Sequence, residues 1–457
     1  MADSSSQKKN IDKQYKRFLS VYLNRILALQ ASFKIMDDAL NILSRTRSKE
    51  ASEFLQKNAE FKKRGKSEYC LLDFDDHIKY EGILEDAYHS TRAKQVIANN
   101  LLVALVSEFD VLLRYIVETI IQYKGWSELK VPEVDVQLDK IIEDLEGVTS
   151  IKKLSEIKSK FYTRASSGIF ASDRKKIFVW LQKSLNLKNE KFVDSSVFIE
   201  ICERRNAIVH NDGKVSAQYL EQCKKYGCNI SKKLKEEDSL DVTYEYFVRS
   251  HECVAQIGVA LSSLIWLKLL NVTKDDSIDR FLNNEVCVKL LNSKHYSVAF
   301  SILNFIRNEL VSASDQMRRI FIINLALALK GMRKKLQAIK LINSEDWTAV
   351  GLALNLAINV LKENYPTAIK IMKKIGSNGD ITKNDYKTWP LFIDIRKERI
   401  FLQAYQEVFG EGFKEIEQHS SSQLCLQISN AKDKTLRDVL EKEFQDAALE
   451  PKQKAKL

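Results

Sequence analysis

The sequence predicts an all-α protein, and three observations support this fold class. The 457 residues include only 14 glycines and 4 prolines, so the turn residues that a many-stranded sheet needs at its corners are scarce. Hydrophobic residues make up 45% of the chain and recur with helical spacing over long stretches. Glycine is also too scarce for dinucleotide-binding or phosphate-binding loops, which argues against Rossmann and P-loop enzymes.

Helical periodicity and its interruptions divide the chain into four expected parts. Residues 1–88 are expected to form an N-terminal helical extension, and residues 89–272 a helical bundle that begins with a long amphipathic helix. Residues 273–445 have the pattern of short helical hairpins, and residues 446–457 are expected to form a basic tail. The predicted architecture is therefore a helical bundle followed by helical hairpins.

The hairpins of the third part repeat in sequence. Asn324-Leu-Ala followed by Ala338-Ile-Lys returns as Asn355-Leu-Ala followed by Ala368-Ile-Lys, a period of 30 to 31 residues. This period resembles that of tetratricopeptide-type helical hairpins, which would offer a surface for a protein partner or trigger. An irregular helical bundle is the alternative interpretation.

The apolar runs and the cysteines indicate where the protein is located and whether it binds a metal or cofactor. Charged residues interrupt the longest apolar run, residues 97–117, so no membrane association and a cytoplasmic location are expected. Seven scattered cysteines are typical of reduced thiols. The closest pair, Cys223 and Cys228, is spaced too widely for a CxxC motif, and neither a metal nor a cofactor is expected.

The most informative stretch is a helix expected from about residue 195 to His210. Arg205 falls in the apolar stripe that is expected to be buried, which consists of Val197, Phe198, Ile201, Ile208 and Val209. A guanidinium among apolar side chains is costly without an anionic partner, so Arg205 has to be held. Glu108, at the edge of the apolar face of the long helix of residues 89–123, is the candidate partner.

His210 occupies the last turn of this helix, because Asn211-Asp-Gly213 is a strong stop signal. An imidazole at a helix C-terminus can exchange a proton near neutral pH. Asn206 lies four residues earlier on the same face and can orient the ring or a ligand oxygen. A histidine that only caps the last carbonyl groups of the helix is the structural alternative.

A fixed cation, a proton carrier and a neutral amide are the groups that metal-independent RNA cleavage requires. One histidine cannot easily serve both ends of an in-line displacement, so a two-fold dimer would have to bring two such helices together. On an ideal helix Arg205 and His210 are about 140° apart, so the arginine must reach around or the last turn must deviate.

Arg205-Asn206-x-x-x-His210 resembles the R-x4-6-H motif of the HEPN superfamily, and the string from Glu203 to Tyr219 is similar to bacterial phage-defence and conflict-system HEPN proteins. The resemblance implies an α-helical bundle that forms a homodimer through the motif helices and acts as an endoribonuclease. By position, Arg205 and His210 would be catalytic and Asn206 a polar helper, with Arg204, Asp212 and Glu108 supporting them. Some members of the superfamily bind without cleaving.

Basic residues beside the motif predict where RNA would bind. The chain carries a formal net charge of +11, which favours a polyanionic partner. Eight of the residues from Arg204 to Lys235 are lysine or arginine and two are acidic; Lys214, Lys224 and Lys225 are the candidate RNA-binding residues. Because three acidic residues follow at once, a solvated charged face is the alternative.

The expected function is a metal-independent endoribonuclease that leaves a 2′,3′-cyclic phosphate and acts as a toxin or abortive-infection antiviral effector. Two alternatives stay open. One is a catalytically inactive HEPN module in a helical scaffold that binds RNA or protein. The other is a protein-interaction scaffold that binds no RNA.

Overall fold

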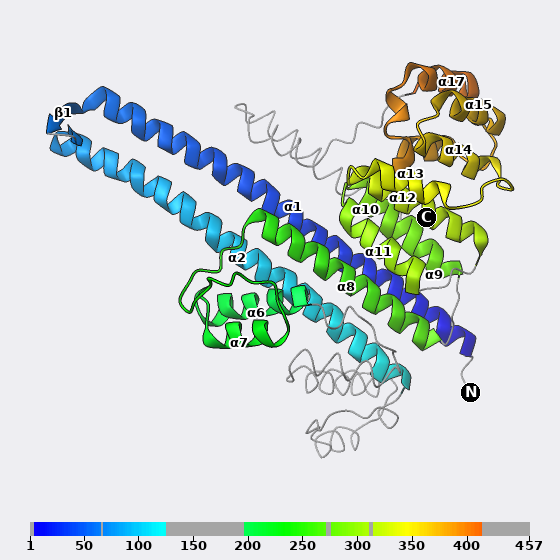
Figure 1. Cartoon of the computed structure of the whole chain (residues 1–457), viewed down its shortest axis with the longest axis horizontal. Coiled ribbons are helices and arrows are strands. Elements are labelled where there is room, and N and C mark those ends of the chain that lie inside the picture. Colours follow the sequence, from blue (N-terminus) through cyan, green and yellow to red (C-terminus); the bar gives the residue numbers. More distant parts are fainter. Residues whose placement is uncertain (1–3, 65–66, 125–195, 271–275, 310–313, 414–457) are drawn as a thin grey trace, which may run out of the picture. The chain divides into compact units, whose positions relative to one another are not determined.

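The computed structural model describes residues 4–64, 67–124, 196–270, 276–309 and 314–413, in two compact units, Met1–Ser344 and Glu345–Leu457 (Figure 1). The all-α class is confirmed: in the described part of the chain, one β-hairpin is the only sheet. The first unit contains α1 (Ser4–Asn58), β1 (Glu60–Arg64), β2 (Ser67–Leu71), α2 (Phe74–Lys124), α6 (Ser196–His210), α7 (Ala217–Lys225), α8 (Tyr244–Leu270), α9 (Asp276–Arg280), a π-helix (Phe281–Cys287), α10 (Val288–Asn292), α11 (Tyr296–Glu309), α12 (Asp315–Gly331) and α13 (Lys335–Asn343).

The second unit contains α14 (Leu352–Leu361), α15 (Tyr365–Ile375), α16 (Lys383–Thr388), two short 3-10 helices (Pro390–Phe392 and Ile395–Lys397) and α17 (Arg399–Phe409). Its core is aromatic: the buried rings of Tyr386 and Phe392 lie 4.8 Å apart, and Phe401 and Tyr405 are also fully buried. The start of α16 is fixed by a capping box between Thr382 and Asp385.

The structure places the domain boundaries differently from the sequence prediction. The predicted boundary at residue 88 falls inside α2, and α1 shares one apolar core with α2 and α8, so residues 1–88 are not a separate extension. The division between the two units comes at Ser344, not at residue 272. The predicted basic tail of residues 446–457 lies outside the described residues.

The contact between α1 and α8 is close and specific. Tyr15 stacks on Trp266 with ring centroids 3.9 Å apart, and the Tyr22 hydroxyl donates to the Val254 carbonyl at 2.9 Å. A Cβ atom on Gly258 would lie 2.6 Å from the Tyr22 ring, nearer than real Cβ contacts come. The glycine is therefore required for the two helices to approach this closely.

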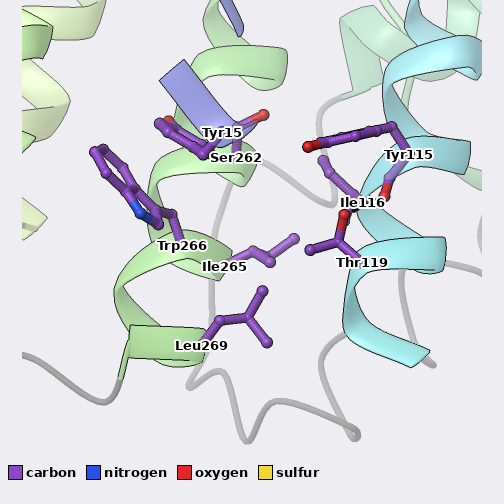
Figure 2. A pocket seen from close by; sticks show the side chains of 8 residues that line it. All are labelled: Tyr15, Tyr115, Ile116, Thr119, Ser262, Ile265, Trp266 and Leu269. Carbon is purple, nitrogen blue, oxygen red and sulfur yellow. Dashed lines mark hydrogen bonds between the residues drawn. The ribbon is translucent and has the colours of Figure 1, made fainter. Parts of the chain in front are cut away.

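Figure 2 shows a small apolar hollow between the ends of α8 and α2. Tyr15 and Trp266 line it from α1 and α8, and Tyr115, Ile116 and Thr119 line it from α2. The three long helices therefore pack around one shared space.

Beyond the start of α8, α1 and α2 continue as a two-helix arm that ends in the β-hairpin (Figure 1). α8 begins beside Phe33 of α1, whose ring centroid lies 5.5 Å from that of Tyr244. Ion pairs between the two helices hold the arm together, including Lys94–Asp37 at 2.7 Å. The sequence analysis did not predict the two strands between α1 and α2.

Three helix-to-helix connections have the same geometry. In each connection one residue has a φ near +60°; these residues are Lys294, Arg333 and Glu363. The amide of the residue that follows donates a hydrogen bond to the carbonyl five residues before it. Five residues after each lies a buried alanine: Ala299, Ala338 and Ala368. The alanine half of the predicted repeat is therefore present three times, in α11, α13 and α15.

The asparagine half of the predicted repeat is wrong. Asn324 lies nine residues before Arg333, is buried and donates to Asn283 Oδ1 at 2.7 Å. Asn355 lies only eight residues before Glu363 and is exposed. One residue turns a helix position by about 100°, so the two asparagines are on different faces. The tetratricopeptide resemblance itself stays a prediction.

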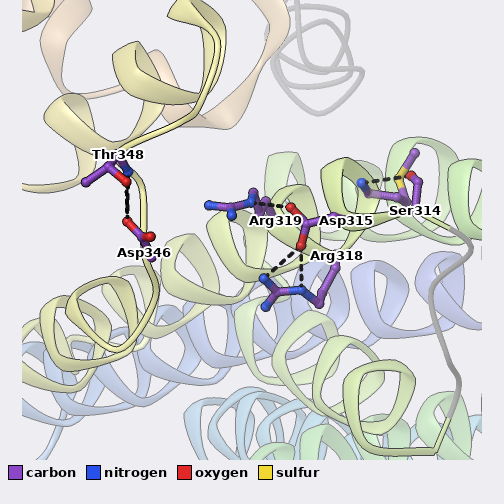
Figure 3. A network of polar contacts seen from close by, with 7 residues as sticks. Ser314, Asp315, Arg318, Arg319, Asp346 and Thr348 are labelled. Carbon is purple, nitrogen blue, oxygen red and sulfur yellow. Dashed lines mark hydrogen bonds and ion pairs between the residues drawn. The ribbon is translucent and has the colours of Figure 1, made fainter.

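The first turn of α12 is fixed by charge and capping (Figure 3). Ser314 Oγ accepts from the Met317 amide at 3.2 Å. Asp315 pairs with Arg319 at 2.7 Å and Arg318 at 3.0 Å. Hydrogen bonds from these two guanidinium groups, Arg319 first, lower the pKa of the Asp315 carboxyl below its usual value.

Two helices are long and apolar enough by composition to span a membrane, α2 over residues 74–120 and α8 over residues 244–269. No such helix was expected from the sequence. The apolar 18-residue window within each helix is 39% and 67% buried within the protein respectively, and core helices of water-soluble proteins meet the same criterion.

His251 of α8 is a polar group in the core. The side chain is fully buried, and its ring interacts with the backbone of Ile26. Burial, and then the nearby His295 ring 5.8 Å away, lower its pKa to about 3. In the unfolded chain its pKa is about 6.5, so below that pH only the unfolded state takes up the proton.

We therefore expect stability to fall as the pH drops from about 6.5 towards 3. The contribution of His251 is about 1.4 kcal/mol between pH 7.5 and 5.5. His251→Leu should remove that part of the pH dependence and leave the protein at least as stable at pH 7.5. Denaturant unfolding at the two pH values measures the difference. The exposed His89→Leu variant is the control; an equal change in its pH dependence would contradict the assignment.

Candidate functional site

The motif helix α6 has the bounds that the sequence predicts, Ser196–His210. It packs against α2 through Phe198, whose ring meets that of Phe109 edge to face with centroids 4.9 Å apart. Ile201 is buried in the same core. The helix is therefore anchored through its first two turns, and its last turn leads to the surface.

The predicted stop signal ends the helix. The amides of Asn211 and Gly213 both donate to the Ala207 carbonyl, at 2.8 and 3.1 Å. Asp212 and Gly213 have φ values of 50° and 71°, in the left-handed region that terminates helices. Asp212 is exposed and shapes the backbone, and the cap leaves the exposed His210 as the last residue of α6.

Arg205 is partly buried, as its place in the apolar stripe predicts, but its partner is not Glu108. The Glu108 carboxylate lies on the side of α2 that faces α1 and pairs with Arg25 at 3.2 Å. Arg205 Nη1 donates to Asn206 Oδ1 at 3.3 Å. Its Nε is buried and has no partner among the described residues. The Nε–H of Arg205 is therefore a buried donor without an acceptor in the described part of the chain.

The anion near the motif is Glu200, which sequence reasoning missed, and it holds Arg204. The Glu200 carboxylate accepts from Arg204 Nε at 2.8 Å and from the hydroxyls of Tyr219 and Tyr246, each at 2.7 Å. Arg204 also donates to the Asp241 carbonyl at 2.8 Å and lies 4.1 Å from the Tyr246 ring centroid. The spacing of Glu200 and Arg204, four residues apart, was the signal in the sequence.

This cluster, the Glu200 cluster, joins three helices: Glu200 and Arg204 come from α6, Tyr219 from α7 and Tyr246 from α8. The Glu200 and Arg204 side chains are only 11% and 14% exposed. Burial, followed by the nearby carboxylate, raises the pKa of both tyrosines, which keeps them protonated as donors. The cluster fixes α6 in position but is not exposed to a ligand.

The predicted RNA-binding lysines differ in their surroundings. Lys214 pairs with Glu237 at 3.1 Å, next to the backbone pairing of residues 213–215 with residues 237–240. Lys224 and Lys225 are exposed in the last turn of α7. Two of the three cations are thus directed to solvent at the same helix end.

No group of three or more potential metal ligands occurs within the described ranges. Cys223 and Cys228 are free thiols, and burial raises the pKa of Cys223 to about 12, so it is protonated near neutral pH. The last two turns of α6 carry the Arg205 guanidinium, the Asn206 amide and the exposed His210 imidazole.

Removing the Glu200 carboxylate should loosen α6. Glu200→Ala leaves Arg204 and two tyrosine hydroxyls buried without their acceptor, a loss of roughly 3–5 kcal/mol for breaking a buried pair. Hydrogen exchange of the α6 and α7 amides measures the local stability. Glu200→Leu combined with Arg204→Met should cost less, because no charge is left buried. The exposed Glu221→Ala control should change nothing; equal exchange in Glu200→Ala would refute the clamping role.

Comparison of the chain with protein-family models, curated proteins and solved structures finds no match. The function is therefore inferred from the geometry at the end of α6.

Proposed function

We propose that this protein is a metal-independent endoribonuclease of the HEPN type that acts in the cytoplasm as a toxin or abortive-infection antiviral effector. The observation that carries the proposal is the end of α6. An exposed imidazole is fixed as its last residue, and a partly buried guanidinium with an unpartnered Nε lies five residues earlier. The Glu200 cluster keeps this helix in one position.

In the proposed reaction the 2′-hydroxyl oxygen attacks the adjacent phosphorus while the bond to the 5′-oxygen breaks. One His210 accepts the 2′-hydroxyl proton, and a second, protonated His210 donates a proton to the 5′-oxygen. The products are a 2′,3′-cyclic phosphate and a 5′-hydroxyl. Arg205 stabilises the negative charge on the phosphorane oxygens, and Asn206 orients a phosphate oxygen or the guanidinium.

The second histidine comes from a second copy of the chain in this proposal. Two-fold pairing of α6 would place two imidazoles and two guanidinium groups in one groove. Such pairing would also accommodate the separation of about 140° between Arg205 and His210 on one helix. Arg205 of one copy could then lie beside the His210 imidazole of the second copy. Val197 and Val209, which the sequence places in the buried stripe, are instead exposed near the two ends of α6. They would provide apolar surface for this contact.

The exposed Lys224 and Lys225 would bind phosphates of the RNA on either side of the scissile bond. Lys214 would join them only by giving up its ion pair with Glu237. The helical hairpins α10–α13 and α14–α15 are the proposed docking region for a protein partner or trigger.

Purified full-length protein should cleave RNA in the presence of EDTA. His210→Ala and Arg205→Ala should each reduce the rate by about a hundredfold or more, the range for losing a proton-transfer or charge-stabilising group. His89→Ala, an exposed histidine far from α6 in sequence, is the control and should keep full activity. RNA binding without cleavage by the wild type would instead indicate the catalytically inactive binding module.

The dimeric site makes a second prediction. When wild-type protein is mixed with an excess of His210→Ala protein, each mixed dimer has one histidine at the cleavage site. Activity should then fall with the square of the wild-type fraction, because both histidines are needed. A linear fall would show that each chain works alone and would contradict the shared site.

A further inference from the structure

The end of α7 brings two cysteines together. The helix ends in a turn in which Gly227 has a φ of 62°, in the left-handed region. The Cys228 amide donates to the Cys223 carbonyl at 2.8 Å, and the Gly227 amide donates to the Lys224 carbonyl at 3.2 Å. These two bonds define a Schellman motif, in which the side chains of the first and last residues commonly contact each other. In α7 these two residues are both cysteines.

The backbone separation of the pair fits a disulfide. With standard bond lengths, the 2.8 Å bond between the Cys228 nitrogen and the Cys223 oxygen keeps the two Cα atoms within about 6.7 Å of each other. Disulfides usually span Cα separations of about 4.4 to 6.8 Å. A bond between the two sulfurs therefore needs no large movement of the main chain.

The two thiols already interact, but they differ in access. A hydrogen bond joins the thiol groups of Cys223 and Cys228, and both pack in one small apolar cluster with Val215 and Tyr219. Cys223 is fully buried, whereas Cys228 is partly exposed. A small reagent can therefore reach Cys228, and Cys223 reacts through its neighbour.

The pair lies next to features that concern the candidate site. Lys224 and Lys225 are enclosed between the two cysteines in the sequence. Tyr219, which donates to the Glu200 carboxylate, also interacts with the Cys223 thiol. A covalent bond at this place would fix the last turn of α7 beside the cluster that holds α6.

We propose that Cys223 and Cys228 form a reversible disulfide across the end of α7 when the protein meets a small-molecule disulfide such as oxidised glutathione. In a reducing environment the pair stays as two free thiols. The pair is thus a redox-sensitive modification site, and its formation does not depend on whether RNA is cleaved.

The exchange proceeds in two steps. The Cys228 thiolate attacks one sulfur of the small disulfide, which forms a mixed disulfide and releases one small thiol. The Cys223 sulfur then attacks the Cys228 sulfur, which forms the intramolecular bond and releases the second small thiol. The two protons of the cysteines end on the released thiols, and the two electrons that the cysteines lose reduce the small disulfide.

The rate of this exchange depends on pH. Burial raises the pKa of both thiols, so the attacking thiolate is scarce near neutral pH. Disulfide formation should be about tenfold faster at pH 8 than at pH 7, because below the pKa the thiolate fraction rises tenfold with each pH unit.

Mass spectrometry of the full-length protein tests the proposal. The protein is equilibrated with mixtures of reduced and oxidised glutathione, its free thiols are blocked with a maleimide, and the chain is cut with trypsin. Because trypsin cleaves after Lys224 and Lys225, the disulfide leaves the peptides of residues 215–224 and 226–232 joined. In the native protein the joined peptides should exceed the glutathione adduct of Cys228 at least tenfold. In guanidinium chloride, which removes the turn, this ratio should fall at least tenfold.

Single variants separate the roles of the two thiols. Cys223→Ala should accumulate the glutathione adduct on Cys228, whereas Cys228→Ser should leave the buried Cys223 unmodified. Cys253→Ser removes another partly exposed thiol and is the control that should keep the disulfide. Oxidation of the wild type should slow hydrogen exchange of the Cys228 amide at least tenfold, and Cys223→Ala should lose this effect.

Three results would overturn the proposal. They are a glutathione adduct on Cys228 without joined peptides, a ratio that is equal in native and denatured protein, and a disulfide from Cys228 to another cysteine. None of these measurements uses RNA, so their outcome is independent of the proposed cleavage by Arg205 and His210.

Discussion

The architecture of the first unit depends on the burial of α1 against α8 and α2. Two tyrosines of α1 secure this contact, with Tyr15 stacked on Trp266 and Tyr22 pressed against Gly258. Any side chain at Gly258 would push the helices apart, because the Tyr22 ring occupies the space. α2, held in this way, provides the surface on which α6 packs through Phe109 and Phe198. The position of the candidate site thus traces back to the α1–α8 contact.

The Glu200 cluster is the second constraint. The buried Glu200 carboxylate accepts hydrogen bonds from three donors on three helices in place of water. One of these donors is Arg204, whose charge the carboxylate neutralises. The two neighbouring arginines of α6 differ in their surroundings. The Glu200 carboxylate and the Asp241 carbonyl hold Arg204, whereas the buried Nε of Arg205 has no partner among the described residues.

Local signals predicted the local features well. The bounds of α6 follow from its apolar spacing and from the Asn211-Asp-Gly213 stop, since both act within a few residues. The partner of Arg205 could not be predicted in the same way. Whether Glu108 faces α1 or α6 depends on how the helices pack, and local sequence does not determine this packing. In the structure Glu108 forms an ion pair with Arg25, and the buried acid near the motif is Glu200 of α6.

The repeat illustrates a similar limit. Ala338 and Ala368 were paired correctly because a small residue is needed where helices cross closely, but the third member, Ala299, lies 39 residues before Ala338 and escaped a search for a 30-residue period. Asn324 and Asn355 look equivalent in sequence. Their distances from the following turn differ by one residue, so they lie on different helix faces. The hairpin of β1 and β2 was missed because its strands are only five residues long.

The length of α2 separates the β-hairpin from the candidate site. From Phe74 to Asn99, the residue that faces the cap of α6 at Gly213, the helix rises about 40 Å. The hairpin at the tip of the arm and the candidate site are therefore separated by this length of helix, so a molecule bound at the tip would not touch the end of α6.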